Sequence, residues 1–143
     1  MARTYQVTAS TRLVNRIMGL LIRLGTGPRG LHILSVRGRR TGRVHSTPVR
    51  VLELDGRRWL VSPYGEVGWV KNARAAGEVT LRRGRGSEMV KVTEVSPREA
   101  TPVLRTYIKE ESFARPYFDV AFDASDEAIE AQAPRHPVFR IED

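Results

Sequence analysis

The dipeptide Asp55-Gly56 is the feature of the sequence that most constrains the fold, because it favours a two-residue hairpin turn. It joins two runs with strand-like residue patterns, "VHSTPVRVLEL" at 44–54 and "RRWLVSPY" at 57–64. A third run of this kind, "LHILSV" at 31–36, comes shortly before them. Three neighbouring strand-like runs joined by turns predict an antiparallel sheet.

The second half of the chain continues this pattern. The runs "EVTLRRG" at 78–84 and "SEMVKVTEV" at 87–95 predict another hairpin, and "HPVFRI" at 136–141 predicts a closing strand. Pro48 lies inside the second run, and it predicts an edge position or a bulge because proline cannot donate a ladder hydrogen bond. Five or six antiparallel strands with a few short helices are typical of a small β-barrel with closed or protected edges.

Helical signals flank and interrupt the strands. Residues 11–24 repeat apolar side chains at helical spacing with arginines between them, which predicts a basic amphipathic helix. Such a helix packs on its own domain or lies on an anionic membrane surface. Residues 96–99, "SPRE", form a capping box with proline at the first helical position and predict a helix through about Glu110. Shorter helices are expected at about 67–76, before Gly77, and at 125–131.

The length of the chain, 143 residues, favours one domain. We assign residues 1–143 to a single barrel domain, with a helical extension over 1–27 and the barrel over 31–141. The segment "GTGPRG" at 25–30 matches the glycine spacing of a dinucleotide-binding fingerprint. That fingerprint requires a strand before it and a helix after it, which is the reverse of the order here. We therefore interpret the segment as a connector.

Positive charge dominates the composition, with a net charge of +8 and with arginine as 21 of the 24 basic residues. Arginine binds phosphate and carboxylate groups in bidentate fashion, so an anionic partner is expected. Aromatic residues are not interleaved with the arginines, which argues against a nucleic acid as partner. The chain has no cysteine, and its three histidines are too scattered to form a metal motif, so no bound metal is expected.

The sequence also indicates where the protein works. No secretory signal is recognisable, and no apolar run reaches the roughly 18–20 residues of a membrane span. The expected location is the cytoplasm. Peripheral contact with the inner face of the membrane through residues 11–24 is the alternative.

The basic residues are densest in "VRGRRTGRVHSTPVR" at 36–50, which holds five arginines and two glycines. Gly38 and Gly42 allow turns and the close approach of a ligand. The residues between and after them supply guanidinium and hydroxyl groups: Arg39, Arg40, Thr41 and Arg43. The segment is either a binding site for a phosphate or several carboxylates, or a solvated hairpin turn. No catalytic motif accompanies it, so an enzyme of this sequence would need a cofactor to carry the chemistry.

Four segments in order resemble the deazaflavin-dependent nitroreductase family: "SVRGRRTGRVHSTPV", "DGRRWLVSPYG", "GWVKNARAAGEVTL" and "HPVFRI". The resemblance runs over about residues 31–141. It implies a mainly β (α+β) chain with the antiparallel split β-barrel of FMN-binding proteins such as the pyridoxamine-phosphate oxidases. It also implies binding of coenzyme F-420, an 8-hydroxy-5-deazaflavin with a phosphodiester and an oligoglutamate tail. That polyanion suits the arginine-rich turn, and FMN is the less favoured cofactor.

The resemblance assigns coenzyme contacts to particular positions. Those for the phosphate and the tail are Arg39, Arg40, Thr41 and Gly42, with His45 where relatives often carry an arginine. Those that line the ring pocket with backbone groups are Thr47, Pro48 and Val49. Those after the third strand are Ser62, Pro63 and Tyr64, and those on the helix opposite the deazaflavin are Trp69 and Asn72. Tyr107 aligns with a substrate-pocket tyrosine and is the candidate catalytic residue and proton donor.

The implied activity is hydride transfer from the reduced coenzyme to a small electron-poor acceptor: a quinone, an enone or a nitro compound. Phe113 and Tyr117 stand where relatives carry other pocket tyrosines, so the sequence does not specify the acceptor. Two alternatives stay open. One is a non-catalytic protein that binds the coenzyme or a lipid at the membrane, and the other is an FMN-dependent oxidoreductase of the same fold. A monomer and a homodimer are both compatible with the sequence.

Overall fold

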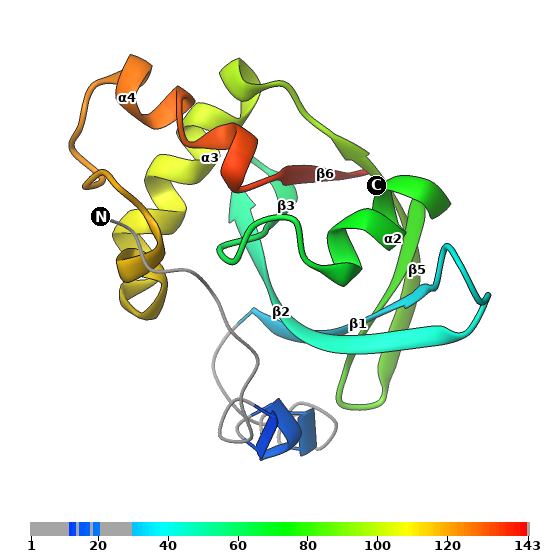
Figure 1. Cartoon of the computed structure of the whole chain (residues 1–143). Helices are drawn as coiled ribbons and strands as arrows, with labels where there is room; N and C mark the ends of the chain where they lie inside the picture. The colour runs from blue at the N-terminus through cyan, green and yellow to red at the C-terminus, as the bar shows by residue number, and fades with distance from the viewer. Residues whose placement is uncertain (1–11, 14, 18, 21–29, 143) are drawn as a thin grey trace.

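The computed structural model describes residues 12–13, 15–17, 19–20 and 30–142 (Figure 1). Within these residues, six strands close into an antiparallel barrel in the order β1-β2-β3-β6-β5-β4. The strands are β1 (Leu31–Arg37), β2 (Val44–Leu54), β3 (Arg57–Val61), β4 (Glu78–Arg83), β5 (Gly86–Glu94) and β6 (Val138–Glu142). The predicted small antiparallel barrel of five or six strands is confirmed.

The turn between β2 and β3 has the predicted geometry. Asp55 and Gly56 both adopt positive φ angles, 54° and 73°, as a tight two-residue hairpin requires. The expected length of β3 is wrong, because the strand ends at Val61 and residues 62–64 leave the sheet. The side chain of Ser62 explains this ending, since its hydroxyl donates a 2.6 Å hydrogen bond to the carbonyl of Gly65 and closes a turn.

Pro48 occupies an edge, as predicted. Residues 44–50 of β2 pair with β1, whereas only residues 51–54 pair with β3. Val51 donates its N–H to the carbonyl of Gly30 on the β1 side, and antiparallel strands alternate the direction of successive amides. The N–H that Pro48 lacks would therefore point away from β1, toward the side where residues 44–50 have no strand partner within the described chain. Residues 44–50 of β2 therefore form an open sheet edge within a barrel that the remaining strand pairs close.

Two apolar clusters hold the fold together. One fills the barrel: Leu34, Val36, Val49, Val51, Leu60, Val79, Leu81, Val90, Val92, Phe139 and Ile141. Helix α2 (Gly68–Ala76) adds Val70 and Ala73 to this cluster and packs against the barrel (Figure 1). The other cluster lies where helix α3 (Pro97–Glu110) packs on the outer faces of β2, β3 and β6, around Leu52, Trp59 and Leu104.

The residues that the sequence predicts to begin or end the helices do so in the structure. Gly77 ends α2 with a φ of 74°, and the hydroxyl of Ser96 accepts a 3.2 Å hydrogen bond from the N–H of Glu99 at the start of α3. Helix α4 (Asp126–Glu130) begins after Ser125, whose hydroxyl accepts from the third residue of the helix. Two short 3-10 helices were not expected from the sequence, η1 (Ser112–Tyr117) and η2 (Ala133–Arg135).

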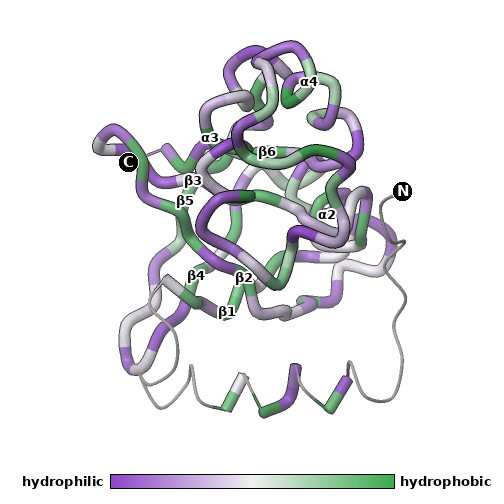
Figure 2. Tube along the Cα trace, turned by 90° about the vertical axis from the view of Figure 1, so that its left-hand side faces the viewer, coloured by the Kyte–Doolittle hydropathy of each residue, from purple (hydrophilic) through white to green (hydrophobic). Residues whose placement is uncertain are grey.

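The predicted amino-terminal helix is described only in part. Its described residues between 12 and 20 are helical, and Figure 2 shows hydrophobic and hydrophilic positions alternating along them. Leu13, Ile17 and Leu20 are each more than half exposed. The rest of residues 11–24 lies outside the described residues. None of the described helices is long and apolar enough to cross a bilayer, and peripheral membrane contact stays a prediction.

Candidate coenzyme-binding site

The arginine-rich segment forms a tight turn between β1 and β2. Gly38 donates its N–H to the carbonyl of Arg43 at 2.6 Å, and Gly42 donates to the carbonyl of Gly38 at 3.0 Å. Gly42 has a φ of 76°, in the left-handed region that glycine adopts most readily. A Cβ atom on Gly38 would lie 3.0 Å from both the Arg43 carbonyl and the His45 ring. The turn therefore has a fixed backbone shape that depends on both glycines.

A contact between Arg39 and Asn72 ties this turn to α2. The backbone N–H and the Nη1 group of Arg39 both donate to Oδ1 of Asn72, at 3.1 and 2.8 Å. Asn72 is only 6% exposed. The structure thus brings together two predicted coenzyme contacts from distant parts of the sequence. It also gives the Asn72 side chain a partner in the turn itself.

Among the described residues, the other arginines of the turn have no acidic partner. Arg37, Arg40 and Arg43 are exposed, and none of them forms an ion pair with a carboxylate among the described residues. The ion pairs elsewhere engage Arg50, Arg58, Arg74, Arg105, Arg135 and Arg140. The hydroxyl of Thr41 accepts from the backbone N–H of Arg43 at 3.3 Å. A turn with exposed, unneutralised guanidinium groups fits a ligand that carries phosphate and carboxylate groups.

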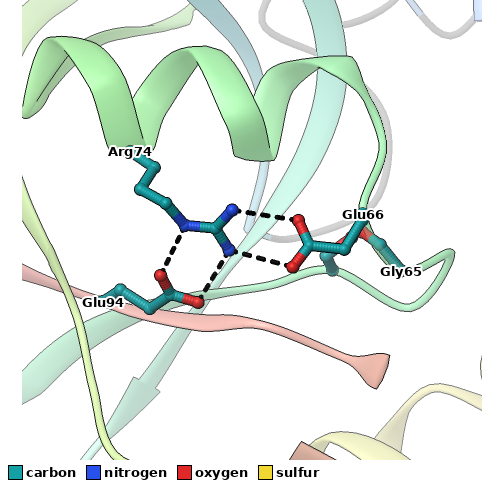
Figure 3. A network of polar contacts seen from close by, with 5 residues as sticks. Gly65, Glu66, Arg74 and Glu94 are labelled. Atoms are coloured by element: carbon teal, nitrogen blue, oxygen red, sulfur yellow. Dashed lines mark hydrogen bonds and ion pairs between the residues drawn. The ribbon is translucent and has the colours of Figure 1, made fainter. Parts of the chain in front are cut away.

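Arg74 fixes the position of α2 (Figure 3). Its Nη1 and Nη2 groups bind the two carboxylate oxygens of Glu66 at 3.1 and 3.0 Å. Its Nε and Nη2 groups bind those of Glu94, at the end of β5, at 2.7 and 3.0 Å. These hydrogen bonds raise the pKa of Arg74 further above its already high value. The guanidinium joins the loop before α2, the helix and the barrel, and so helps to hold Asn72 opposite the turn.

The open edge of β2 lies next to the turn in sequence. Side chains along this stretch alternate between the two faces of the sheet. The side chain of Val49 belongs to the barrel core, and His45 and Thr47 lie on the same face of the strand as Val49. By the alternation described for Pro48, the backbone groups of Ser46 and Pro48 face the open edge. The expectation that this stretch contacts the deazaflavin ring through backbone groups is compatible with that edge, and it stays a prediction.

The three predicted contact residues in the loop after β3 differ in how deeply they are buried. Ser62 and Pro63 are buried, and the Ser62 side chain is bonded to Gly65. The carbonyl of Ser62 lies 3.3 Å from Nδ1 of His136, whose ring stacks on Phe118 at 3.9 Å between centroids. Burial lowers the pKa of His136, so the neutral ring is the form that fits there. Ser62 and Pro63 shape the loop, whereas the Tyr64 side chain is only half-buried.

Tyr64, Trp69 and Tyr107, the predicted site residues with aromatic rings, each pack against a different aromatic residue. The ring of Tyr64 meets that of Tyr117 edge to face, with 4.9 Å between centroids. Tyr107 is 2% exposed, and its pKa is raised by burial, with smaller contributions from Glu111 and Tyr64. Its phenol therefore stays protonated at all physiological pH values. Trp69 packs against Phe139 of the barrel core, 5.8 Å between centroids, which leaves it half-buried.

Two hollows lie away from the arginine-rich turn. One of about 400 Å³ is formed by the β2–β3 hairpin, residues 53–58. The other, of about 410 Å³, is lined by Gly30, His32, Arg50, Val51, Leu52, Glu53, Arg58 and Glu110. The turn itself is an exposed surface feature.

Arg50 and Glu111 were not among the residues predicted from the sequence, and they form an ion pair between β2 and the end of α3. One signal for them was available. Glu110 and Glu111 place two carboxylates at the end of a predicted helix, where the helix dipole disfavours negative charge. An acidic helix end of this kind calls for a basic partner from another element.

Comparison with solved structures identifies the fold class of the chain. Similar solved structures include a domain-swapped dimer, with a TM-score of 0.59 and 16% identity over 93% of this chain and 96% of that one. An F-420-H2-dependent reductase matches with a TM-score of 0.54 and 16% identity over 80% and 95%. An FAD-binding protein from Mesorhizobium loti matches with a TM-score of 0.50 and 15% identity over 85% and 86%. These likenesses show the split β-barrel fold.

Comparison of the sequence with protein families identifies the family of the chain. The family of F-420H(2)-dependent quinone reductases matches residues 6–125, and the chain belongs to that family. It is therefore an oxidoreductase whose cofactor is coenzyme F-420, as the resemblance implied. The matched region begins upstream of residue 31 and includes the predicted amino-terminal helix. Among curated proteins, none matches the sequence.

Proposed function

We propose that this reductase binds reduced coenzyme F-420 along the β1–β2 turn and the open edge of β2, and reduces a small quinone, enone or nitro compound. The observation that carries the proposal is the turn itself. Its exposed arginines have no acidic partner among the described residues, and its backbone is tied to the buried Asn72. The bound coenzyme supplies the hydride. The protein binds and orients the two reactants and excludes water.

Each part of the site has a task in this proposal. Arg40 and Arg43 bind the phosphate and the carboxylates of the tail, and the Thr41 and Gly42 segment keeps the turn in shape. Asn72 holds Arg39, which limits the movement of the turn. These contacts anchor the charged part of the coenzyme. Backbone groups at Ser46 and Pro48 and the half-buried rings of Tyr64 and Trp69 then orient its flat part.

We place the acceptor beside a group of aromatic residues: Tyr64, Tyr117 and Phe113. Tyr64 and Tyr117 meet edge to face, and η1 also carries Phe113, which is 53% exposed. Flat conjugated molecules pack well on such rings, because aromatic pairs add stacking energy to the burial of apolar area. This composition supports a planar, electron-poor acceptor, with quinones favoured over small aliphatic enones.

We expect purified protein to oxidise reduced F-420 in the presence of a soluble quinone, and more slowly with a small aliphatic enone. Loss of the reduced coenzyme, followed by its absorbance, measures both rates. Phe113→Ala should lower the rate with the quinone more than the rate with the enone, because it removes an exposed aromatic surface. Binding of the coenzyme without oxidation by any of the three acceptor classes would favour the non-catalytic alternative.

A further inference from the structure

The segment between α4 and β6 contacts two parts of the chain that lie far apart in the sequence. Ser62, at the start of the loop after β3, donates its N–H to the carbonyl of Pro137 at 2.9 Å. In the same loop, a Cβ atom on Gly65 would lie 3.2 Å from the carbonyl of Arg135, so the two backbones approach closely there. The segment also reaches the end of η1, because Arg135 forms a 2.6 Å ion pair with Asp119. It therefore holds the loop after β3 and the end of η1 together.

His136 lies in the middle of this segment, and its side chain contacts both parts. The residue is 5% exposed, and its Nδ1 atom lies 3.3 Å from the carbonyl of Ser62. Its ring stacks on Phe118, with 3.9 Å between centroids and 25° between the planes. A carbonyl oxygen can only accept, so Nδ1 carries the proton of the neutral ring. Burial lowers the pKa of His136, which favours that neutral form.

The residues next to these two contacts carry rings that we place beside the acceptor. Tyr64 comes two residues after Ser62, and Tyr117 directly precedes Phe118. The two tyrosine rings meet edge to face, with 4.9 Å between centroids. Their relative position depends on how the loop after β3 and the end of η1 are held. The side chain of His136 is in contact with both.

We propose that His136 is a positioning residue for the acceptor site, and that it holds Tyr64 and Tyr117 at the spacing that binds a flat acceptor. This inference rests on the proposed function. His136 acts through the backbone of Ser62 and the ring of Phe118, to which its two contacts are made. Loss of either contact lets the two tyrosine rings move relative to one another, and binding of the acceptor becomes weaker.

Two substitutions of His136 each remove one of its contacts. His136→Asn keeps an amide N–H near the position of Nδ1 and loses the stack on Phe118, whereas His136→Phe keeps a ring and loses the hydrogen bond to Ser62. We expect each to raise the KM of a soluble quinone roughly 2- to 12-fold, which corresponds to the loss of one aromatic contact. The kcat should stay unchanged, as expected for a residue that affects only acceptor binding. The Kd of the coenzyme should change much less than the KM, because the arginine-rich turn anchors the coenzyme.

His32→Asn is the matched control. The Nδ1 atom of His32 also lies within hydrogen-bond distance of a backbone carbonyl, that of Gly30 at 2.8 Å, but at the start of β1. This residue lines a hollow that lies away from the arginine-rich turn. Its replacement should keep the wild-type KM for the quinone.

The ring-proton NMR resonances of Tyr64 and Tyr117 test the link without any turnover. Rings that meet edge to face shift each other's resonances, so a change in their spacing moves these signals. Both His136 variants should move the resonances of the two tyrosines, and His32→Asn should leave them in place.

The neutral state of His136 also has a consequence for stability. The charged and titratable groups near its ring are Arg135 and Asp119, with Tyr107 packed on Phe118 at 6.4 Å between centroids. Because the pKa is lowered in the folded state, the unfolded chain binds more protons at pH values just below the ordinary histidine range of about 6.5. The free energy of unfolding of the wild type, relative to His136→Phe, should therefore fall as the pH decreases through that range. Urea denaturation of both proteins between about pH 8 and about pH 5 measures this difference.

Phe118→Leu keeps the hydrogen bond to Ser62 and removes the ring on which His136 stacks, so it tests the link even if the His136 variants fail to fold. An active wild type whose quinone KM and tyrosine resonances are unchanged by these substitutions would overturn this proposal alone. An equal rise of KM in His32→Asn would also count against it. A wild type that binds the coenzyme and reduces no acceptor would contradict the proposed function, and the tyrosine resonances would then decide whether His136 positions the two rings.

Discussion

Replacing Asn72 with alanine is expected to lower the free energy of unfolding by about 2–3 kcal/mol and to weaken coenzyme binding. The substitution removes the acceptor of two hydrogen bonds, one of them from the Arg39 guanidinium. Hydrogen bonds to charged groups contribute roughly 1.5–3 kcal/mol and neutral ones roughly 0.5–1.5 kcal/mol. Because the turn is exposed, water compensates part of this loss. Without its tie to α2, the turn would also have to be ordered by the coenzyme, at the expense of affinity.

Asn72→Asp separates the two effects. A carboxylate at this position still accepts from Arg39, so most of the stability should be retained. It also neutralises Arg39 and places a negative charge near the proposed phosphate position, so the coenzyme should bind more weakly than to the wild type. Urea denaturation and fluorescence titration of the coenzyme give the two quantities. An Asn72→Ala protein with wild-type stability and wild-type affinity would contradict the role given to this contact.

Replacing Arg40 with alanine is expected to raise the Kd of the coenzyme about 10- to 150-fold and to leave the melting temperature almost unchanged. The affinity estimate follows from the roughly 1.5–3 kcal/mol of one charge-assisted hydrogen-bonding group, since about 1.4 kcal/mol corresponds to a factor of ten. The stability expectation follows from the structure, because Arg40 is exposed and forms no ion pair among the described residues. Deazaflavin fluorescence and thermal denaturation measure the two effects.

Arg82→Ala is the matched control for Arg40. Arg82 is also an exposed arginine near a β-turn, but it pairs with Ile33 near the start of β1, whereas the Arg40 turn follows the end of β1 at Arg37. Its loss should change the Kd very little. The wild-type affinity should fall as salt is added, because partly exposed charge pairs are screened. Small and equal effects at both positions would indicate that the arginine-rich turn is a solvated turn without a ligand.

The parts of the fold that were predictable from the sequence are those with local signals. The Asp55-Gly56 turn, the cap at Ser96 and the stop at Gly77 each depend on residues within one turn of the chain. Pro48 predicted an edge for a similar reason, since its missing N–H is a property of one residue. Short 3-10 helices such as η1 lack a comparable signal, because three to six residues are too few for a periodic pattern.

The contacts that shape the candidate site were not predictable, because they join elements far apart in the sequence. Arg39 and Asn72 are 33 residues apart, and Arg50 and Glu110 are 60 apart. Such pairs meet only after the barrel closes and α3 packs on its outer face. Ser62 shows a different limit, because its partner Gly65 is only three residues away, yet the resemblance gives the position of Ser62 and not the hydrogen bond that occupies its hydroxyl.

The most direct test of this account is a parallel titration of the purified protein with coenzyme F-420 and with FMN. FMN offers a single phosphate, whereas F-420 adds the carboxylates of its tail, and we propose that these bind the turn arginines that form no ion pair among the described residues. We predict saturable F-420 binding with a Kd in the micromolar range or below, and clearly weaker binding of FMN. Saturable binding of FMN with no response to the deazaflavin coenzyme would contradict the account.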